Sequence, residues 1–323
     1  MFYTKPHLCS YCITFRCPSK CVFCGLWRDK SLREIHDADF DDVKKNLLAL
    51  KKLGVKMIDF TGGEPLLHEH LPEILALSKE LGFFTKLSTS GVQYLDRASE
   101  IQNLASRIYF SIDTLSKEEY REMRGIDAFE QVIESVKLAK KLKENVYVVS
   151  TISNQNIRAL PALAHFCKEN KINAVIHPCF SYFGNEGLNK KYIKEMTRYF
   201  LTPYVRPNLP QLKFYYDGGN NRQNTRCKAG SSIFEIEPNN TVPVPCFSKR
   251  VKNIKIDDNL FEIYHSDEWR RSFQDAGTYD FCEHCSIDCY FGLSFLDRLD
   301  EYPIRQILTG FRQLIETAKR NGK

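Results

Sequence analysis

The stretch Cys17-Pro-Ser-Lys-Cys21-Val-Phe-Cys24 places three cysteines in one short loop, directly after a strand-like run over residues 11–16. Thiolates are soft ligands, which select iron–sulfur clusters, zinc or copper(I) over hard cations. A closed cluster or a structural zinc site takes four protein ligands, whereas this loop offers three. The pattern therefore indicates a metal centre with one open position, at which a substrate can bind.

A glycine turn, Thr61-Gly62-Gly63-Glu64-Pro65, follows further along the chain. The cysteine loop and this turn, in this order, resemble the cluster loop and the S-adenosylmethionine (SAM) segment of radical SAM enzymes. In that family three cysteines hold three irons of a [4Fe–4S] cluster, and SAM chelates the fourth. The resemblance implies that Cys17, Cys21 and Cys24 are the cluster ligands. The alternative is a zinc knuckle beside an unrelated glycine turn.

The resemblance also assigns SAM contacts to residues near the ends of strands. Gly62 and Gly63 lack a Cβ and would let the backbone approach the ligand closely, and Glu64 would bind the methionine ammonium. The other implied contacts are one aromatic residue of the cysteine loop and polar residues of later strands: Phe23, Ser88, Ser90, Ser111, Asp113, Arg124 and Asn156. Alternatives are a polar strand end for Ser88, a surface salt bridge for Arg124 and a helix cap for Asn156.

Composition sets the broad class of the protein. The 323 residues are 43% hydrophobic and 27% charged, which is typical of a globular chain of one or two domains. No apolar run approaches the ~20 residues of a membrane span, and no signal peptide is visible, so we expect a cytoplasmic protein. Twelve cysteines in such a chain favour metal ligands over disulfides. The net charge of +6 is weak support for an anionic substrate or partner.

Short apolar strands alternate with helices in the first 180 or so residues, which is typical of parallel β/α units. The expected strands cover residues 10–16, 55–60, 83–87, 107–112, 145–151 and 173–176. Six such units resemble the partial (β/α)6 TIM-like barrel of radical SAM enzymes, so the predicted fold class is α/β. Chemistry in β/α barrels collects at the carboxyl ends of the strands. The cysteine loop, the glycine turn and Ser88-Thr89-Ser90-Gly91 all fall there.

We expect a radical SAM core followed by a small cysteine-rich extension and a terminal helix. The predicted segments are a core over 1–185, a connection over 186–225, an auxiliary domain over 226–296 and an amphipathic helix over 297–323. In the connection, residues 212–216 read as an aromatic strand, whose Phe214, Tyr215 and Tyr216 we expect in the core rather than in a substrate pocket. We expect the terminal helix to close the barrel.

The extension contains Cys227, Cys246, Cys282, Cys285 and Cys289. Two residues between Cys282 and Cys285 suit two thiolates on one metal centre. The set resembles the SPASM extension, or its shorter version called twitch, which carries auxiliary [4Fe–4S] clusters. Five thiols are too few for two clusters, so we expect one auxiliary [4Fe–4S] cluster, with Cys289 as the least certain ligand. Structural zinc is the alternative.

The extension departs from the family pattern before its second cysteine. The family usually has a glycine there, whereas this chain has Asn240 or Thr241. Asparagine tolerates the left-handed backbone conformation better than other non-glycine residues. We therefore expect the turn to survive the replacement.

Several further residues carry chemistry without a clear role. Cys9 and Cys12 form a further pair, separated by two residues. We expect them to be partly buried structural thiols rather than ligands of another metal centre. Cys179 follows the sixth strand and could donate a hydrogen atom to a substrate radical, with a buried thiol as the alternative. His177, like His68 and His70, is expected to be a hydrogen-bonded wall residue rather than a catalyst.

The resemblance implies a radical SAM oxidoreductase. Such an enzyme cleaves SAM reductively to a 5′-deoxyadenosyl radical, abstracts a substrate hydrogen atom and completes an oxidation or a bond formation with help from the auxiliary cluster. The substrate would be a peptide or protein, or a small molecule such as an aminosugar or a lipid precursor. We expect an electron donor such as flavodoxin or ferredoxin, and no nucleic acid. The alternative is a non-catalytic iron–sulfur or zinc protein that binds nucleic acid or a protein partner.

The N-terminal part of the chain bears on the choice between these substrates. The barrel is predicted to begin within the first 17 residues, so we expect no peptide-recognition domain ahead of it. This expectation argues against an enzyme that recognises its peptide substrate by itself. A separately encoded protein can still recognise the peptide.

Overall fold

The structure is a computed structural model that describes residues 5–181, 184–257, 259–296, 298 and 300–310. Its centre is an eight-stranded parallel sheet in the order β7-β6-β5-β4-β3-β2-β1-β8. The strands are β1 (Leu8–Thr14), β2 (Met57–Gly62), β3 (Phe84–Thr89), β4 (Arg107–Ser111), β5 (Val146–Ile152), β6 (Asn173–Pro178), β7 (Val205–Pro207) and β8 (Ile233–Ile236). The six predicted strands are confirmed.

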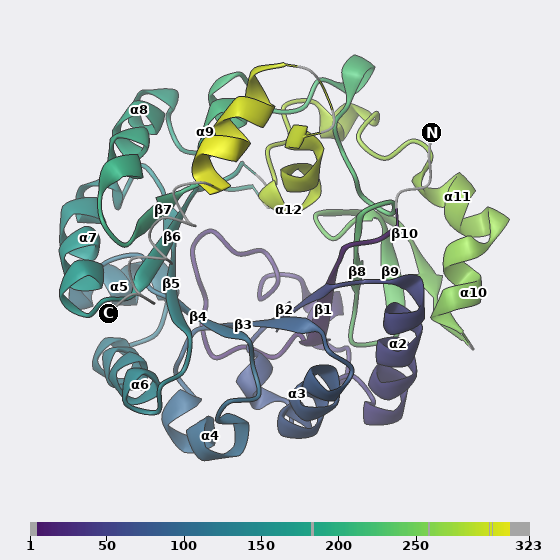
Figure 1. Cartoon of the computed structure of the whole chain (residues 1–323), viewed down its shortest axis with the longest axis horizontal. Coiled ribbons are helices and arrows are strands. Elements are labelled where there is room, and N and C mark those ends of the chain that lie inside the picture. Colours follow the sequence, from purple (N-terminus) through teal and green to yellow (C-terminus); the bar gives the residue numbers. More distant parts are fainter. Residues whose placement is uncertain (1–4, 182–183, 258, 297, 299, 311–323) are drawn as a thin grey trace.

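The sheet curls into a partial barrel that stays open between β7 and β8 (Figure 1). These two strands were not predicted, and both lie beyond the first six units. β8 belongs to the predicted auxiliary segment, yet it pairs in parallel with β1, where Ser10 lies opposite Glu235. The cysteine-rich extension therefore contributes a strand to the barrel wall instead of forming a separate body.

Helices cover the outer face of this sheet (Figure 1). They are α2 (Phe40–Leu53), α3 (Leu71–Glu80), α4 (Tyr94–Ile101), α5 (Lys117–Arg124), α6 (Phe129–Lys141), α7 (Leu160–Glu169) and α8 (Lys190–Arg198). In α2, Asp39 accepts hydrogen bonds from the first-turn amides, and Gly54 ends the helix with a left-handed φ of 85°. Its apolar stripe, which includes Val43 and Leu47, is fully buried against the sheet.

Side chains of the strands alternate between the outer core and the interior of the barrel. In β2, Ile58 and Phe60 are fully buried in the outer core. Asp59 lies between them and bonds to Lys86 and Ser88 of β3 instead. Because successive side chains of a strand point to opposite faces, these three residues face the interior of the barrel.

The C-terminal part adds a hairpin and short helices. These elements are β9 (Thr241–Cys246), β10 (Lys249–Lys255), α10 (Leu260–His265), α11 (Asp267–Phe273) and α12 (Asp288–Phe291). Asn240 enters β9 with a φ of 58°, so the prediction that asparagine replaces the family's glycine in a left-handed turn is confirmed. α12 lies on the open side of the barrel (Figure 1).

The prediction of an aromatic strand over 212–216 is wrong. These residues belong to the helix α9 (Leu209–Tyr216), which Asn208 caps and in which Pro210 stands in the first turn. A short apolar run fits a strand or a buried helix equally. Here the N-cap Asn208 and the proline in the first turn favour the helix. Phe214 packs in the core on Phe291, as expected, whereas Tyr216 is exposed.

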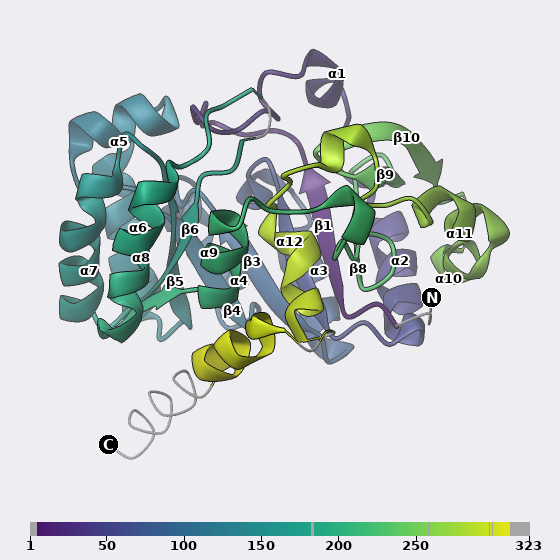
Figure 2. The same ribbon diagram turned by 90° about the horizontal axis from the view of Figure 1, so that it is seen from above.

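The terminal helix is described over residues 301–310, and the rest of the predicted helix lies outside the described residues. Its first turn packs through Tyr302 on Phe295. Ile304, Ile307 and Leu308 are at least half exposed. Figure 2 shows this helix at the edge of the barrel away from α1 (Lys30–Arg33). In the described residues it therefore does not close the barrel with its apolar side.

Candidate active site

The loop that carries the three cysteines follows the carboxyl end of β1 and leads to α1 (Figure 2). Cys21 is buried, Cys24 is half-buried and Cys17 is exposed. Although residue Cys17 is exposed as a whole, the surrounding chain partly buries its thiol. This burial raises the pKa of Cys17 to about 12, and the charges of Glu64 and of the Cys21 and Cys24 thiols add to the rise. The fold therefore brings the predicted trio within range of mutual charge repulsion.

The end of α5 holds this loop in place. The amide of Lys20 donates to the carbonyl oxygen of Arg124 at 2.8 Å, and the amide of Val22 donates to that of Met123 at 2.9 Å. Gly125 ends the helix with a φ of 65°, and a Cβ there would lie 2.8 Å from the Lys20 carbonyl oxygen. Backbone hydrogen bonds and close packing therefore fix the cysteine loop to a helix end that is distant in sequence.

Gly62 and Gly63 pack against the chain's own backbone at the base of the cysteine loop. The amide of Gly63 donates to Thr14 at 2.8 Å, and the amide of Glu64 donates to Arg16 at 2.7 Å. A Cβ on Gly63 would lie 2.2 Å from the carbonyl oxygen of Arg16. This contact requires glycine whether or not a ligand is present, and sequence reasoning assigned the pair to the ligand alone.

Glu64 joins the glycine turn to the end of β3. Its buried carboxylate accepts hydrogen bonds from the Leu66 amide at 3.1 Å, the Thr89 hydroxyl at 2.7 Å, and both the amide and the hydroxyl of Ser90. Burial raises the pKa of Glu64, and these hydrogen bonds oppose the rise. The predicted contacts Glu64 and Ser90 are therefore brought together, and they bond to each other.

Asp113 and Arg124 form a buried ion pair beside the cysteine loop. The distance from Arg124 Nη2 to Asp113 Oδ2 is 2.5 Å, and Arg124 Nη1 lies 3.6 Å from Cys21 Sγ. The guanidinium also lies 5.3 Å from the centre of the Phe23 ring. Arg124 is 7% exposed, so the surface salt bridge is excluded as its role. The pair places a positive charge against a predicted cluster ligand.

Asn156 supports this arrangement from behind. Its side-chain amide donates to the carbonyl oxygens of Asp113 and Thr151, both at 2.9 Å, and its oxygen accepts from the Ser153 amide at 2.7 Å. Asn156 thus ties the end of β4 to the end of β5. Ser111 is half-buried at the last position of β4.

Three buried polar atoms in or near the cysteine loop have no partner among the described residues. They are the hydroxyl of Ser19 within the loop, Arg124 Nε, and the hydroxyl of Tyr120, a residue of α5 that is 1% exposed. Buried polar groups are normally hydrogen-bonded. These three atoms therefore mark space that a polar ligand fits.

The interior of the barrel holds a cluster of charged residues that sequence reasoning missed. The Lys86 ammonium is 2.5 Å from Asp59, and Ser88 donates to the same carboxylate at 3.0 Å. On the open side, His177 Nδ1 of β6 is 3.5 Å from Asp288 of α12. Burial lowers the pKa of His177, and Asp288 opposes this shift. The sequence does contain a signal for this cluster, namely charged residues at inward positions of β2 and β3.

Four cysteines of the extension interact electrostatically, whereas the main charges that act on the fifth come from elsewhere. Burial raises the pKa of Cys227, and the thiols of Cys285, Cys246 and Cys282 raise it further. Cys289 is exposed, and the charges that act on it are those of the barrel interior, including Asp288, Lys86 and Asp59. In the described residues no three His, Cys, Asp or Glu side chains already form a metal-binding group.

The remaining thiols are buried apart from both groups. Cys9 is fully buried and Cys12 is 4% exposed, which confirms the expectation of buried thiols. Cys179 is 3% exposed, and the side-chain amide of Asn185 lies 3.3 Å from its sulfur. This burial fits the alternative stated for Cys179, a buried thiol, and its role as hydrogen donor stays a prediction. His68 is also buried and bonds to the Ala38 carbonyl oxygen.

Comparisons with known proteins agree with this geometry. The profile of the Radical SAM superfamily matches residues 11–167. A probable GTP 3′,8-cyclase of Pyrococcus abyssi is 26% identical over 188 residues, which cover 57% of this chain and 59% of the relative. The Fe-coproporphyrin III synthase of Methanosarcina barkeri is 28% identical over 188 residues, covering 57% and 45%. These matches span less than two thirds of the relatives' own length.

Solved structures share the fold over most of the chain. SuiB of Streptococcus suis, bound to the precursor peptide SuiA, superimposes with a TM-score of 0.70 at 18% identity and covers 92% of this chain and 74% of its own. The enzyme anSMEcpe with bound AdoMet has a TM-score of 0.62 at 17% identity, covering 97% and 100%. At these identities the likeness concerns the fold. No described helix is both long and apolar enough to cross a membrane.

Proposed function

We propose that this protein, whose residues 11–167 belong to the radical SAM superfamily, is an oxidoreductase that cleaves SAM reductively and oxidises or couples a bound substrate. Cys17, Cys21 and Cys24 would hold the [4Fe–4S] cluster. The observation that carries the proposal is the convergence of the cysteine loop, the glycine turn and the Asp113–Arg124 pair at one edge of the barrel. When bound, the cluster and SAM supply reductive cleavage of the sulfonium and a 5′-deoxyadenosyl radical.

The residues present fit these groups. Three thiols leave one ligand position for SAM, and the unpartnered Arg124 Nε and Tyr120 hydroxyl can bond to a carboxylate such as that of methionine. Arg124 offsets the negative charge of Cys21, and Asp113 fixes the orientation of the guanidinium. Ser111, at the adjacent strand end, is proposed to bind the same carboxylate.

Glu64 keeps the glycine turn next to the end of β3. Because four hydrogen bonds already satisfy its carboxylate, we propose that it positions Ser90 and the backbone of the turn for SAM. Gly62 and Gly63 then present backbone groups to the methionine amine. Any direct contact between Glu64 and the ammonium requires one of these hydrogen bonds to be exchanged.

The charged interior of the barrel is proposed to hold the substrate. Lys86 and His177 offer donors, Asp59 and Asp288 offer acceptors, and the exposed thiol of Cys289 lies among them. Such a lining suits a polar substrate with both donor and acceptor groups. In this setting Cys289, and not the covered Cys179, is the thiol that a substrate radical can meet.

A peptide is the favoured substrate class. SuiB, which shares the fold over most of this chain, is bound to its precursor peptide in the solved structure, and this supports a peptide here. A small molecule is the second candidate, because the curated relatives include GTP 3′,8-cyclases.

An auxiliary [4Fe–4S] cluster on Cys227, Cys246, Cys282 and Cys285 is proposed to take up the electron that remains after hydrogen abstraction. The grouping of these four thiols, without Cys289, supports the assignment. Iron and labile sulfide counts test it: two clusters give roughly eight irons per chain, and one cluster gives about four.

The proposed activity is tested by anaerobic incubation of the reconstituted protein with SAM and dithionite. We expect 5′-deoxyadenosine from the native chain and none from Cys21→Ala. A full complement of iron without this product would instead favour a protein that only binds a partner.

A further inference from the structure

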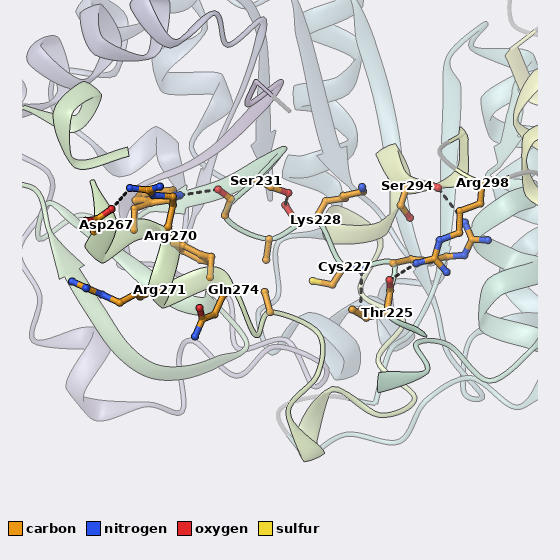
Figure 3. A pocket seen from close by; sticks show the side chains of 16 residues that line it. Thr225, Cys227, Lys228, Ser231, Asp267, Arg270, Arg271, Gln274, Ser294 and Arg298 are labelled. Carbon is orange, nitrogen blue, oxygen red and sulfur yellow. Dashed lines mark hydrogen bonds and ion pairs between the residues drawn. The ribbon is translucent and has the colours of Figure 1, made fainter. Parts of the chain in front are cut away.

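A cavity of about 520 Å³ lies outside the barrel, in the C-terminal part of the chain. Its walls come from residues 225–231, from α11 and from residues 294 and 298 (Figure 3). Residues 225–231 precede β8, whose first residue lies opposite Leu8 at the start of β1. The cavity therefore lies near the amino ends of these strands, whereas the cysteine loop follows the carboxyl end of β1. None of the steps proposed above uses it.

The cavity is distinct from the space of the proposed auxiliary cluster. Of the four described thiols assigned to that cluster, Cys227 lines the cavity, and Cys246, Cys282 and Cys285 do not. A ligand in the cavity would therefore touch one side of the cluster site without filling it. The volume of the cavity is within the ordinary range of protein binding sites.

The lining of this cavity is strongly cationic. Its cations are Arg226, Lys228, Arg270, Arg271 and Arg298, and among the described residues of the lining Asp267 is the single carboxylate. Asp300, just outside, pairs with Arg226, and Asp267 pairs with Arg270. The cations of the described lining therefore outnumber the acidic groups that neutralise them.

Two of the arginines carry charge that no described carboxylate balances. Arg298 donates to the side-chain oxygen of Asn224 at 2.7 Å and to the carbonyl oxygens of Asn224 and Thr225. Arg271 is exposed, and in the part of the chain that the structure describes its guanidinium makes no ion pair. Both guanidinium groups are thus available to carboxylates of a ligand.

Polar and apolar groups also line this cavity. Gln274 of α11 is exposed and Ser231 is half-buried, so both side chains can form hydrogen bonds with a ligand. Phe273 is half-buried, and its ring centre lies 4.8 Å from that of the buried Trp269. The wall thus combines cations, hydrogen-bonding groups and an apolar surface, which together suit a peptide segment.

We propose that this cavity binds an acidic segment of the peptide substrate, outside the residues that react. The carboxylates of the segment would pair with Arg271 and Arg298, and its backbone would bond to polar groups of the wall. Arginine clusters recognise acidic motifs through such charge-assisted hydrogen bonds. The inference rests on the peptide substrate of the proposed function, and it names the charge by which that peptide is recognised. No covalent bond forms or breaks.

The arrangement of the charges favours a peptide over a small anion. Figure 3 shows Arg271 and Arg298 on opposite sides of Cys227. A small anion needs cations that converge on one point, whereas carboxylates spaced along a chain match cations that stand apart. The first turn of α11 carries Asp267 and Glu268, which disfavour a phosphate at that helix end.

A binding site away from the reacting atoms would serve the reaction by raising the local concentration of the peptide. An acidic segment held at the cavity keeps the rest of the same peptide close to the barrel. Entry of the reacting residue into the interior then becomes an intramolecular step. Recognition of the substrate would in this way be a property of the extension itself.

The test measures peptide binding to the reconstituted protein in the presence of SAM and without a reductant. The probes are a dye-labelled octapeptide of alternating glutamate and serine, and the same peptide with glutamine in place of glutamate. Fluorescence anisotropy reports the affinity of each. Inorganic phosphate is added separately, and its effect is followed by melting curves.

Charge variants of α11 locate the binding. Arg271→Glu and the double variant R270E/R271E reverse charge at exposed positions, and Arg271→Lys keeps the charge. Lys137→Glu is the matched control, because Lys137 is exposed on α6, which lies across the molecule from α11 (Figure 1). Melting curves establish that each variant is folded.

We expect the native chain to bind the glutamate peptide roughly tenfold more tightly than the glutamine peptide at low ionic strength, with a smaller difference at high salt. R270E/R271E should lose roughly tenfold in affinity for the glutamate peptide, and Arg271→Glu somewhat less. Arg271→Lys should retain most of the binding, and Lys137→Glu should match the native chain.

Equal affinity of the native chain for the two peptides would overturn the site, as would an equal loss of affinity in Lys137→Glu. The proposal is also overturned if phosphate raises the melting temperature of the native chain and not of R270E/R271E, while both bind the glutamate peptide equally. That outcome would make the cavity a small-anion site.

The binding readout does not depend on SAM cleavage, because no reductant is present. A chain that forms 5′-deoxyadenosine with dithionite but does not discriminate between the peptides would lose this site alone. A chain that discriminates between them without forming 5′-deoxyadenosine would lose the proposed activity alone.

Discussion

Asp113 and Arg124, from the end of β4 and the end of α5, form a buried ion pair that holds a guanidinium against the sulfur of Cys21. The pair connects the barrel sheet to the cysteine loop, since the backbone of the same helix end also bonds to that loop. Burial raises the pKa of Asp113, and Arg124 opposes this shift. The negative charge of Asp113 therefore depends on Arg124, whose guanidinium stays protonated.

Removing Arg124 should destabilise the protein and disturb the first cluster site. Arg124→Ala leaves the Asp113 carboxylate buried without its partner, which costs about 3–5 kcal/mol. We expect a lower melting temperature in differential scanning calorimetry and reduced iron content after reconstitution. The double variant R124A/D113N should recover part of the stability, because it no longer buries a lone charge. A double variant that is no more stable than Arg124→Ala would contradict this explanation.

Gly63→Ala should prevent correct placement of the cysteine loop. The added methyl group would lie 2.2 Å from a backbone oxygen, so the turn and the loop must separate. Overpacking costs about 1–3 kcal/mol or more, and we expect loss of the N-terminal cluster by iron analysis. Gly310→Ala is the control, because a Cβ there meets no atom within 4 Å. Full iron content in Gly63→Ala would show that the contact is dispensable.

Iron counts should distinguish the cysteines of the extension that bind the auxiliary cluster from those that do not. Cys246→Ser should lose about four irons per chain, whereas Cys289→Ser should keep roughly eight. The physical reason is that the charges acting on Cys289 come from the barrel interior, away from the group around Cys227. Loss of four irons from Cys289→Ser would place this thiol among the ligands.

Lys86→Met should impair substrate conversion while it preserves SAM cleavage. The substitution removes the ammonium that pairs with Asp59 and leaves the cysteine loop and the glycine turn untouched. We expect 5′-deoxyadenosine with dithionite at the native rate, and little modified substrate. Equal loss of both products would assign Lys86 to the SAM site or to folding, and a melting curve separates these two cases.

Glu235 should make stability fall as the pH rises from about 4.5 to about 8. Burial raises its pKa to about 8, Glu237 adds to the rise and Arg250 opposes it. Because the folded chain keeps this proton to a higher pH than the unfolded chain does, raising the pH through this window favours unfolding. Glu235→Gln should remove this contribution and gain about 2 kcal/mol or more over the native chain between pH 5 and pH 8. The free energy of unfolding of both proteins is measured by denaturation at several pH values across this window. If the two free energies change with pH in the same way, the raised pKa of Glu235 is disproved.

The order of strands and helices was predictable because each signal is local. The cap at Asp39, the end at Gly54 and the alternation in β2 follow from neighbouring residues alone. The aromatic run over 212–216 was misassigned because its length and composition fit two structures. Its packing on Phe291, a residue distant in sequence, is visible only in the folded chain.

The sequence by itself determined which residues are proposed for the first site: three soft ligands at fixed spacing and a glycine turn, both delivered by strand ends. It also determined the left-handed turn at Asn240, since few residues adopt that backbone conformation. Only the tertiary structure decided which residues meet across the barrel. It made Glu64 a link to Ser90, set Arg124 against Cys21, and separated Cys289 from the other thiols. Such pairings depend on how distant strands and helices pack, and no short stretch of sequence encodes that packing.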